Sequence, residues 1–343
     1  MDKRTKPGGP DARKRPLPSA RQPAKKPARR TTFTGNSLFL ILAILLLTFI
    51  VFLPVFSSDF LSTWDDSDYI TKNQIIRSLN SENLKAMFST QIGGTYVPLP
   101  LLSYAIEYKL FGLSSTAFHF TNLLIHLFCT LFVFEIFRRL GLKPIYAALG
   151  ALLFGIHPMG VESVAWVTER KDLLYTFFYL AAIIAYLAYL KKEPHSYVYL
   201  GVTCGLFLLA LLSKIQAVSL PLVLLVIDFY MKRPVRPKLL VEKIPFFILS
   251  LGFGIAGIFI LKNLGALKIN AMYTLVERLF FGSYAFDAYI LKFFVPVKLS
   301  ALYPYPVKTG ETLPVIYYLS PLLIAALGYG SWKSIQKGHE VLF

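Results

Sequence analysis

The stretch SLFLILAILLLTFIVFLPVF, residues 37–56, is almost wholly apolar, and the polar stretch STWDDSDY, residues 62–69, follows it closely. As one helix it is long enough to cross the roughly 30 Å of a bilayer's hydrocarbon core. Further apolar runs follow, and the chain is 55% hydrophobic with a mean hydropathy of +0.55. Only helices or a closed barrel satisfy the backbone inside lipid, and unbroken apolar runs lack the alternation of a barrel. We therefore predict an all-α, polytopic membrane helical bundle.

Residues 1–35 form a basic segment that holds eleven Lys or Arg residues against Asp2 and Asp11. The segment is rich in Pro, Ala and Gly and almost lacks large apolar side chains, which predicts a disordered tail. Basic flanks stay in the cytoplasm, so we expect a cytoplasmic N-terminus that contacts anionic lipid headgroups rather than nucleic acid. The run 37–56 is then expected to be an uncleaved anchor, because it is too long for a signal peptide.

The apolar runs predict eight or nine spans within one transmembrane domain, residues 36–343. The eight runs with few charges are 37–56, 117–137, 145–157, 173–190, 197–212, 217–230, 244–261 and 315–330. Up to residue 243, the connections expected inside are rich in Lys and Arg, as a consistent orientation requires. The run 276–296 carries Glu277, Arg278, Asp287 and Lys292. Because charges inside a span are costly, this run either crosses as a ninth span or lies half-buried in an external loop.

Two long segments are expected on the extracytoplasmic side of the cell membrane. Residues 57–115 form the first, and we predict interfacial helices in it at 84–88 and 97–111. Residues 262–314 form the second. The chain stops at Val341-Leu342-Phe343, which is typical of the start of another span, so we expect the natural protein to continue.

Charged side chains collect on the side of the predicted bundle that faces away from the cytoplasm. They are Asp65, Asp66, Asp68, Glu162, Glu169, Arg170, Asp172 and Lys214, with Arg278 beyond them. Taken singly, each of these charges is explained as a solvated side chain on the external rim of the bundle. Together they indicate a site, because Arg170 and Lys214 lie at span ends, where both would meet a phosphate at headgroup depth.

His119, Asn122 and His126 follow an i, i+3, i+7 spacing, so they line one face of the second span. Polar groups facing lipid are costly, so this face is expected to point into the bundle. Hydrogen bonds between helices are one explanation for this polar face. A metal site is another, but it would need further ligands. His119 is nearest the external side and could reach a substrate. Both cysteines, Cys129 and Cys204, fall in apolar runs and are read as buried hydrophobes, and no phosphate-binding glycine loop of the Gly-x-x-x-x-Gly-Lys-Ser/Thr type occurs.

An ordered set of short motifs carries a family resemblance over residues 37–343. The set comprises Trp64-Asp65-Asp66 with Tyr69 and Asn73, Tyr96-Val97-Pro98-Leu99, Phe118-His119-Phe120-Thr121-Asn122 with His126, His157-Pro158 with Glu162-Ser163-Val164, Glu169-Arg170-Lys171-Asp172-Leu173, Ser213-Lys214 and Leu302-Tyr303-Pro304. In this order they resemble the glycosyltransferases of the GT-C fold that use polyprenyl-phosphate sugars, and most closely the transmembrane and tetratricopeptide-repeat O-mannosyltransferase-like proteins. The sequence departs from that family at Val97 and Ile215, and it does not include the repeats.

The resemblance implies an acidic pair at the reaction centre, which we assign to Asp65 and Asp66. A positioned carboxylate can accept the proton of an attacking hydroxyl, so we expect an inverting transfer with Asp65 as base and Asp66 as its partner. Glu162 as the base is the alternative. Cations stabilise a leaving phosphate, and Arg170, Lys214 and Arg278 are the candidates. The expected substrate-binding or orienting residues are Glu162, Asp172, His119, Asn122 and Tyr303.

The sequence thus predicts a membrane glycosyltransferase that moves a sugar from a polyprenyl-phosphate donor to an extracytoplasmic hydroxyl of a protein Ser/Thr, glycan or lipid. No cofactor is required by this reading, and a divalent metal held with the aspartate pair stays open. A transporter or flippase of lipid-linked sugars is the main rival. It predicts polar residues through the whole bundle, whereas towards the cytoplasmic side they thin out to His126, Glu135 and Asp228. A scaffold subunit is a third reading, which leaves the aspartate pair without a role.

Overall fold

The computed structural model describes residues 1–2, 35–191, 196–263, 273–304 and 312–336. The predicted disordered tail lies almost wholly outside these residues. So do the chain end at 337–343 and parts of the second predicted loop, at 264–272 and 305–311. Every named element in the described part of the chain is helical, which confirms the predicted all-α class.

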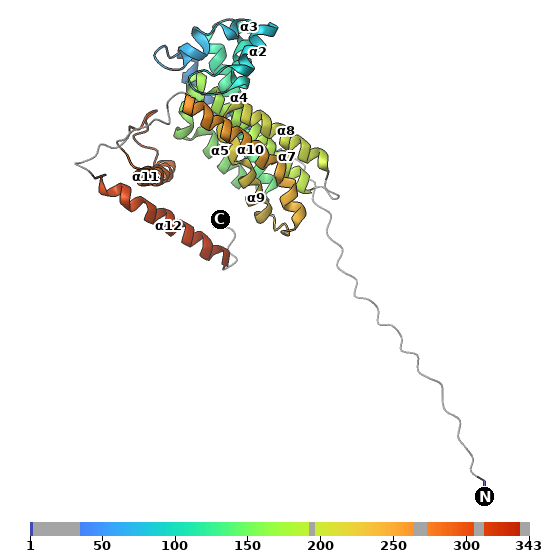
Figure 1. Ribbon diagram of the computed structural model, residues 1–343. Coiled ribbons are helices and arrows are strands. Elements are labelled where there is room, and N and C mark those ends of the chain that lie inside the picture. The colour runs from blue at the N-terminus through green and yellow to red at the C-terminus, as the bar shows by residue number, and fades with distance from the viewer. Residues whose placement is uncertain (3–34, 192–195, 264–272, 305–311, 337–343) are drawn as a thin grey trace.

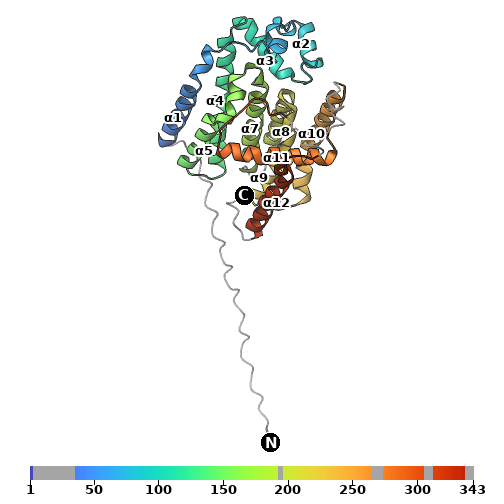
Figure 2. The ribbon, with the colours of Figure 1, turned by 90° about the vertical axis from the view of Figure 1, so that its left-hand side faces the viewer.

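The long apolar helices run side by side as one bundle (Figures 1 and 2). They are α1 (Gly35–Val51), α4 (Ser115–Arg139), α5 (Pro144–Ile156), α7 (Arg170–Lys191), α8 (Tyr197–Ser213), α9 (Leu220–Tyr230) and α10 (Pro237–Asn263). Proline sets several boundaries. Pro54 ends the α-helical hydrogen bonding of the first run, which continues as the 3-10 turn η1 (Leu53–Ser57). Pro144 and Pro237 begin α5 and α10, because the first helical turn needs no proline N–H.

The predicted number of spans is not confirmed. Five helices of the described chain are long and apolar enough to cross a membrane, or six if α5 and the bent segment after it count as one span. The helices α5, α8 and α9 have 13, 17 and 11 residues, and a straight crossing needs about 20. Apolar side chains such as Ile248 (63% exposed) and Leu251 (65%) cover the outside of α10, as expected of a surface that faces lipid.

A helical cap made by residues 58–114 covers one end of the bundle (Figure 1). Its elements are the π-helical turn η2 (Ser67–Thr71), the 3-10 turn η3 (Ile75–Arg77), α2 (Ser81–Ser89) and α3 (Pro98–Phe111). The last two confirm the helices predicted at 84–88 and 97–111. The cap has its own core, in which Ile76, Met87 and Tyr104 are fully buried.

The Tyr69 hydroxyl ties η2 to a tight turn in the cap, because it donates a hydrogen bond to Ile92 O at 2.6 Å. Burial is the main cause that raises the pKa of Tyr69, so the donor proton is retained. The turn needs Gly93 (φ +54°), where a side chain would also crowd Tyr69. This turn and the bond fix η2, which directly follows the Asp65-Asp66 pair.

Three short turns link α5 to α7 below the cap. They are η4 (Pro158–Gly160), α6 (Val161–Ala165) and η5 (Val167–Glu169). At His157-Pro158 the helical segment 158–165 is bent by 48° relative to α5. This bend is expected, because the residue before a proline is disfavoured in the α-helical conformation.

The helices α11 (Leu275–Phe294) and α12 (Val315–Gln336) pack on each other beside the bundle. Figures 1 and 2 show α11 lying across the direction of the bundle helices. It is not among the helices apolar enough to span. Both observations favour the half-buried interpretation of 276–296 over a ninth span.

Candidate active site

Five charged side chains form a row of alternating sign where the cap meets the bundle. Lys171 Nζ lies 3.2 Å from Asp65 Oδ2 and 2.9 Å from Glu169 Oε1. Lys214 Nζ lies 3.5 Å from Glu169 Oε2 and also pairs with Asp172 Oδ1. We call Asp65, Lys171, Glu169, Lys214 and Asp172 the charge chain. Each of its lysines bridges two carboxylates, and the chain carries one net negative charge.

Four separate segments bring the charge chain together. Asp65 precedes η2, Glu169 ends η5, Lys171 and Asp172 lie in the first turn of α7, and Lys214 follows α8 as its C-cap. The ammonium of Lys171 lies over the rings of Tyr69 and Trp166, at 5.4 and 5.8 Å. The middle of the chain is therefore enclosed, whereas the Asp65 side chain at one end is 44% exposed and that of Asp172 at the other is 26% exposed.

Asp66 differs from its neighbour Asp65, because its side chain is buried and its contacts are to uncharged donors. Its Oδ1 accepts hydrogen bonds from Trp166 Nε1 at 3.0 Å and from Thr168 N at 3.1 Å. Its Oδ2 accepts from Leu61 N at 2.8 Å. Asp66 thus joins the cap to η5, and so holds Asp65 and Glu169 at a fixed separation.

Arg170 is fully buried and points away from the charge chain. Its Nη1 pairs with Glu107 Oε2 of α3 at 2.5 Å, and its Nη2 donates to Phe118 O at 2.9 Å. Its Nε donates to Asn122 Oδ1 at 2.7 Å. Arg170 therefore connects α7 to α3 and α4. A guanidinium enclosed in this way is not open to a donor phosphate, so the geometry favours a positioning role over the predicted phosphate contact.

Asn122 completes the same joint. Its Nδ2 lies within hydrogen-bond distance of three carbonyl oxygens of the turns between α5 and α7, those of Val164, Trp166 and Val167, at 3.5, 3.3 and 3.3 Å. The expected face of polar residues on the second span is confirmed as buried. His126 Nε2 donates a hydrogen bond to Gly155 O at 2.8 Å, which fits interhelical bonding.

His119 and Glu162 have different surroundings. His119 is buried, and within the described residues neither ring nitrogen has a hydrogen-bond partner. Glu162 is exposed on α6, and its carboxylate interacts electrostatically with Glu169, Lys214 and Lys171. Glu162 thus lies beside the charge chain, whereas the charged side chains that act on His119 include Asp66 and Arg170.

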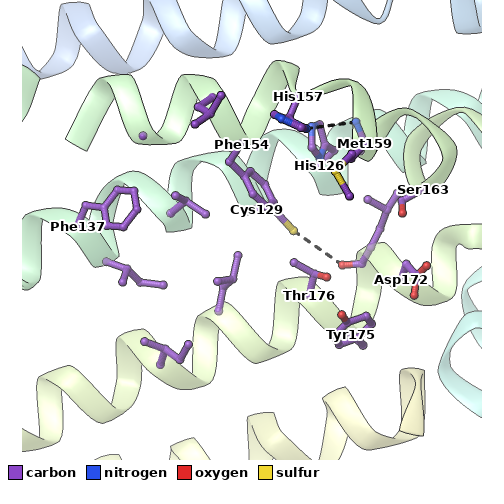
Figure 3. A pocket seen from close by; sticks show the side chains of 18 of the residues that line it. His126, Cys129, Phe137, Phe154, His157, Met159, Ser163, Asp172, Tyr175 and Thr176 are labelled. Carbon is purple, nitrogen blue, oxygen red and sulfur yellow. Dashed lines mark hydrogen bonds between the residues drawn. The ribbon is translucent and has the colours of Figure 1, made fainter. Parts of the chain in front are cut away.

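A mostly apolar groove of about 670 Å³ leads from the middle of the bundle to the charge chain. Figure 3 shows it between α4, α5 and α7, with His126, Cys129 and Phe154 on one side and Tyr175 and Thr176 on the other. Asp172 lies at its polar end with Ser163 and His157. The groove therefore connects an apolar interior to a charged mouth.

The structure does not bring Arg278 or Tyr303 to the charge chain. Arg278 is exposed on α11, and Tyr303, 52% exposed, follows that helix. The observed link from α11 to the groove is Phe293, whose carbonyl and ring contact His157. In the described residues, no three His, Cys, Asp or Glu side chains are grouped so that they could hold a metal ion.

Sequence reasoning assigned no role to Lys171 or Glu107 and did not foresee that Glu169 would lie between the two lysines. A signal for the charge chain was present, because Glu169 and Asp172 are three residues apart and share a helix face, while Arg170 points elsewhere. The Glu107–Arg170 pair has no such signal, since its members lie in separate helices far apart in sequence.

Comparison with known proteins gives a consistent result. A family model described as dolichyl-phosphate-mannose-protein mannosyltransferase matches residues 97–261. A protein O-mannosyl-transferase of Caenorhabditis elegans is 28% identical over 308 residues, which cover 83% of this chain and 42% of that protein. Protein O-mannosyl-transferase TMTC3 of Mus musculus is 29% identical over 46% of this chain and 18% of its own length. TMTC4 of Homo sapiens is 32% identical over 36% of this chain and 19% of its own length.

The chain spans less than half the length of each of these relatives. No solved structure matches it. The relatives are named as transferases, so the comparisons do not favour the transporter reading. The resemblance inferred from the sequence is confirmed: the chain is similar to protein O-mannosyl-transferases over most of its length, and residues 97–261 match the dolichyl-phosphate-mannose-protein mannosyltransferase family model.

Proposed function

We propose that this chain is a membrane glycosyltransferase that moves a sugar from a polyprenyl-phosphate donor to an extracytoplasmic hydroxyl. The family description names a dolichyl-phosphate sugar and a protein acceptor, which favours a protein Ser or Thr over a glycan or lipid acceptor. The observation that carries the proposal is that Asp172 belongs both to the charge chain and to the mouth of the apolar groove.

In this proposal the groove takes the polyprenyl chain, and Lys214 meets the phosphate at its mouth. An ammonium has three donor protons. On Lys214, Asp172 accepts one hydrogen bond and Glu169 forms an ion pair at 3.5 Å, so donor capacity is left for a phosphate oxygen. Negative charge grows on this phosphate as the sugar leaves, so a fixed cation there lowers the barrier.

Asp65 is the proposed base, because its carboxylate is the exposed end of the charge chain. As the acceptor oxygen bonds to the anomeric carbon, the bond from that carbon to the phosphate oxygen breaks and the hydroxyl proton passes to Asp65. One displacement of this kind inverts the anomeric centre. Lys171 orients Asp65 through the 3.2 Å contact.

The remaining site residues have supporting roles in this proposal. Asp66, Arg170 and Asn122 are positioning residues, and Glu162 contacts the sugar. His119, Arg278 and Tyr303 have no assigned step in this proposal, and none of its steps is routed through a metal.

The proposed topology places the cap outside the cytoplasm at the cell membrane. Residues 36–343 form one transmembrane domain in which 57–115 and 262–314 are the two extracytoplasmic segments. The N-terminal segment is then cytoplasmic, and the start of α1 lies at the cytoplasmic end of the bundle.

The test is transfer from dolichyl-phosphate mannose to a Ser/Thr-containing acceptor peptide by the purified full chain. Asp65→Asn should lower the rate about 100- to 10,000-fold, because an amide cannot take the proton. Asp68→Asn is the matched control. Asp68 is an exposed carboxylate of the same loop that accepts from Ser67 Oγ at 3.2 Å, and its loss should leave the rate unchanged.

Asp66→Asn should act on stability instead, because it replaces an acceptor oxygen that faces N–H donors. Full transfer by Asp65→Asn would overturn the assignment of the base. Absence of transfer by the wild-type chain with every polyprenyl-phosphate sugar tried would overturn the proposed activity itself. Mass spectrometry of secreted and membrane proteins with and without this chain identifies the natural acceptor.

A further inference from the structure

A second pocket lies at the end of the bundle opposite the cap, where α9 ends and α10 begins (Figure 1). Its volume is about 350 Å³. Asp228, Lys232 and Arg233 form its polar side, and Leu225, Val235 and Leu240 are among its apolar walls. The pocket thus combines cationic and apolar surface in a small volume. None of these residues has a part in the proposed transfer.

The charge balance of this segment is strongly positive. Residues 228–243 hold five Lys or Arg residues and two carboxylates. Both carboxylates are already paired inside the bundle: Asp228 Oδ2 lies 2.7 Å from Lys243 Nζ, and Glu242 Oε2 lies 2.6 Å from Arg233 Nη1. Lys232, Arg236 and Lys238 are all exposed and add three positive charges around the pocket. Such a surface attracts phosphate groups.

The backbone at the mouth of the pocket adopts an unusual conformation. Lys232 has φ +54°, in the left-handed region that residues other than glycine rarely adopt. Two hydrogen bonds hold it there, from Lys232 N to Phe229 O and from Arg233 N to Asp228 O, both at 2.9 Å. The turn places two consecutive basic side chains on the pocket. Backbone strain of this kind is typical of ligand sites.

The rim of the pocket is apolar and open. Val235 is 85% exposed, Leu240 57% and Phe229 50%. Beside a membrane-spanning bundle, such side chains face acyl chains. A ligand that fits both surfaces has a phosphate at the basic turn and hydrocarbon along the rim.

We propose that this pocket binds the phosphate headgroup of an anionic phospholipid from the leaflet at this end of the bundle. The phosphate lies at Lys232, beside the exposed Arg236, and one acyl chain follows Val235 and Leu240. The proposal does not depend on the transferase activity, because the pocket and the charge chain lie at opposite ends of the bundle.

The test compares two double variants that each remove two positive charges from this end. The pocket variant is Lys232→Asn with Arg236→Gln, where asparagine is chosen because it tolerates the left-handed conformation. The control is Lys143→Gln with Lys191→Gln, both exposed and outside the pocket. Thermal unfolding of the purified full chain is measured in detergent with added phosphatidylglycerol or phosphatidylcholine of identical acyl chains.

Phosphatidylglycerol should raise the wild-type Tm by about 2–5 °C more than phosphatidylcholine does, because ligand binding stabilises the folded state. The pocket variant should lose more than half of this difference, and the control should keep it. Equal losses in both variants, or none in the pocket variant, would overturn the proposal. Inorganic phosphate alone should have no comparable effect, and an equal shift from it would overturn the lipid as the occupant.

Native mass spectrometry of the wild-type chain gives a second readout that needs no folded pocket variant. After exposure to an equimolar mixture of the two lipids, the wild-type chain and the control should retain phosphatidylglycerol preferentially. Equal retention of both lipids by the wild-type chain would overturn the proposal.

Discussion

The bundle carries a cluster of charged side chains at each end, and the two clusters are built differently. The charge chain lies under the cap. The second, which we call the closed cluster, joins α7, α9 and α10 and consists of Tyr186, Tyr189, Asp228, Arg233, Glu242 and Lys243. In it the Tyr186 hydroxyl donates to Asp228 Oδ1 at 2.5 Å and accepts from Lys243 Nζ at 2.6 Å.

The closed cluster balances its own charges, whereas the charge chain does not. Asp228, Glu242 and Lys243 have side chains 3%, 3% and 1% exposed, and two cations meet two carboxylates. Burial alone would lower the pKa of Arg233, but its bond to Glu242 raises it on balance, so this pairing is kept. The charge chain keeps one net negative charge and an exposed carboxylate beside a groove. We infer that the closed cluster fixes the helices in place, and that the charge chain leaves room for a substrate.

The largest expected effect comes from breaking the closed cluster. Asp228→Asn leaves Lys243 buried without its ion pair, and loss of one partner of a buried pair typically costs about 3–5 kcal/mol. The free energy of unfolding, measured by denaturant titration in detergent micelles, should fall by this amount. Transfer activity per folded molecule should not change.

Glu135→Gln is the matched control for this prediction. Glu135 pairs with Arg139 four residues on in α4, and both side chains are partly exposed. Such a pair is worth about 0.3–0.5 kcal/mol. If Asp228→Asn is as mild as this control, then the closed cluster is not the structural joint inferred here.

One substitution made in each cluster sharpens the comparison. Lys214→Met should lower the transfer rate about 100- to 1,000-fold, as expected when a group that stabilises developing charge is removed. Lys243→Met should lower stability and leave the rate per folded molecule unchanged. The two measurements are the transfer rate and the denaturant midpoint of the same preparations.

The opposite pattern would be informative. If Lys243→Met lowered the rate and Lys214→Met lowered only stability, the reaction centre would have to be placed at the α9–α10 end. The proposed donor groove would then have no role in transfer.

The sequence predicted the fold well because apolar runs of span length leave the backbone few choices in lipid. The predicted number of spans is not confirmed, because five or six helices of the described chain are long and apolar enough to cross a membrane, and the remaining apolar helices of the bundle are shorter. The third predicted run, residues 145–157, does end at His157-Pro158, and the chain after it forms the short turns that carry Glu162. The dipeptide was visible in the sequence, but the direction of the chain after it was not.

The structure brings several of the predicted site residues together, but the sequence did not show in which direction each side chain points. Arg170 and Lys171 are adjacent in sequence, yet one points to Glu107 and Asn122 and the other to Asp65. Their difference follows from the helical turn between neighbours and from what packs on each side. The packing partners come from α3 and the cap, and no local sequence pattern identifies them.

The smallest expected effect concerns the pair of Asp65 and Lys171. Because Asp65 is 44% exposed, a double-mutant cycle with Asp65→Asn and Lys171→Met should give a coupling of about 0.2–1 kcal/mol in unfolding free energy. The coupling should shrink between 0.1 and 1 M salt, as the screening length falls from about 10 to about 3 Å. A parallel cycle at Arg233 and Glu242, with Arg233→Met and Glu242→Gln, should give a larger coupling that salt hardly changes. A strong, salt-independent coupling at Asp65 would mean that this end of the charge chain is as closed as the other cluster. An acceptor hydroxyl could not then reach the carboxylate, and the base would have to be sought at Glu162.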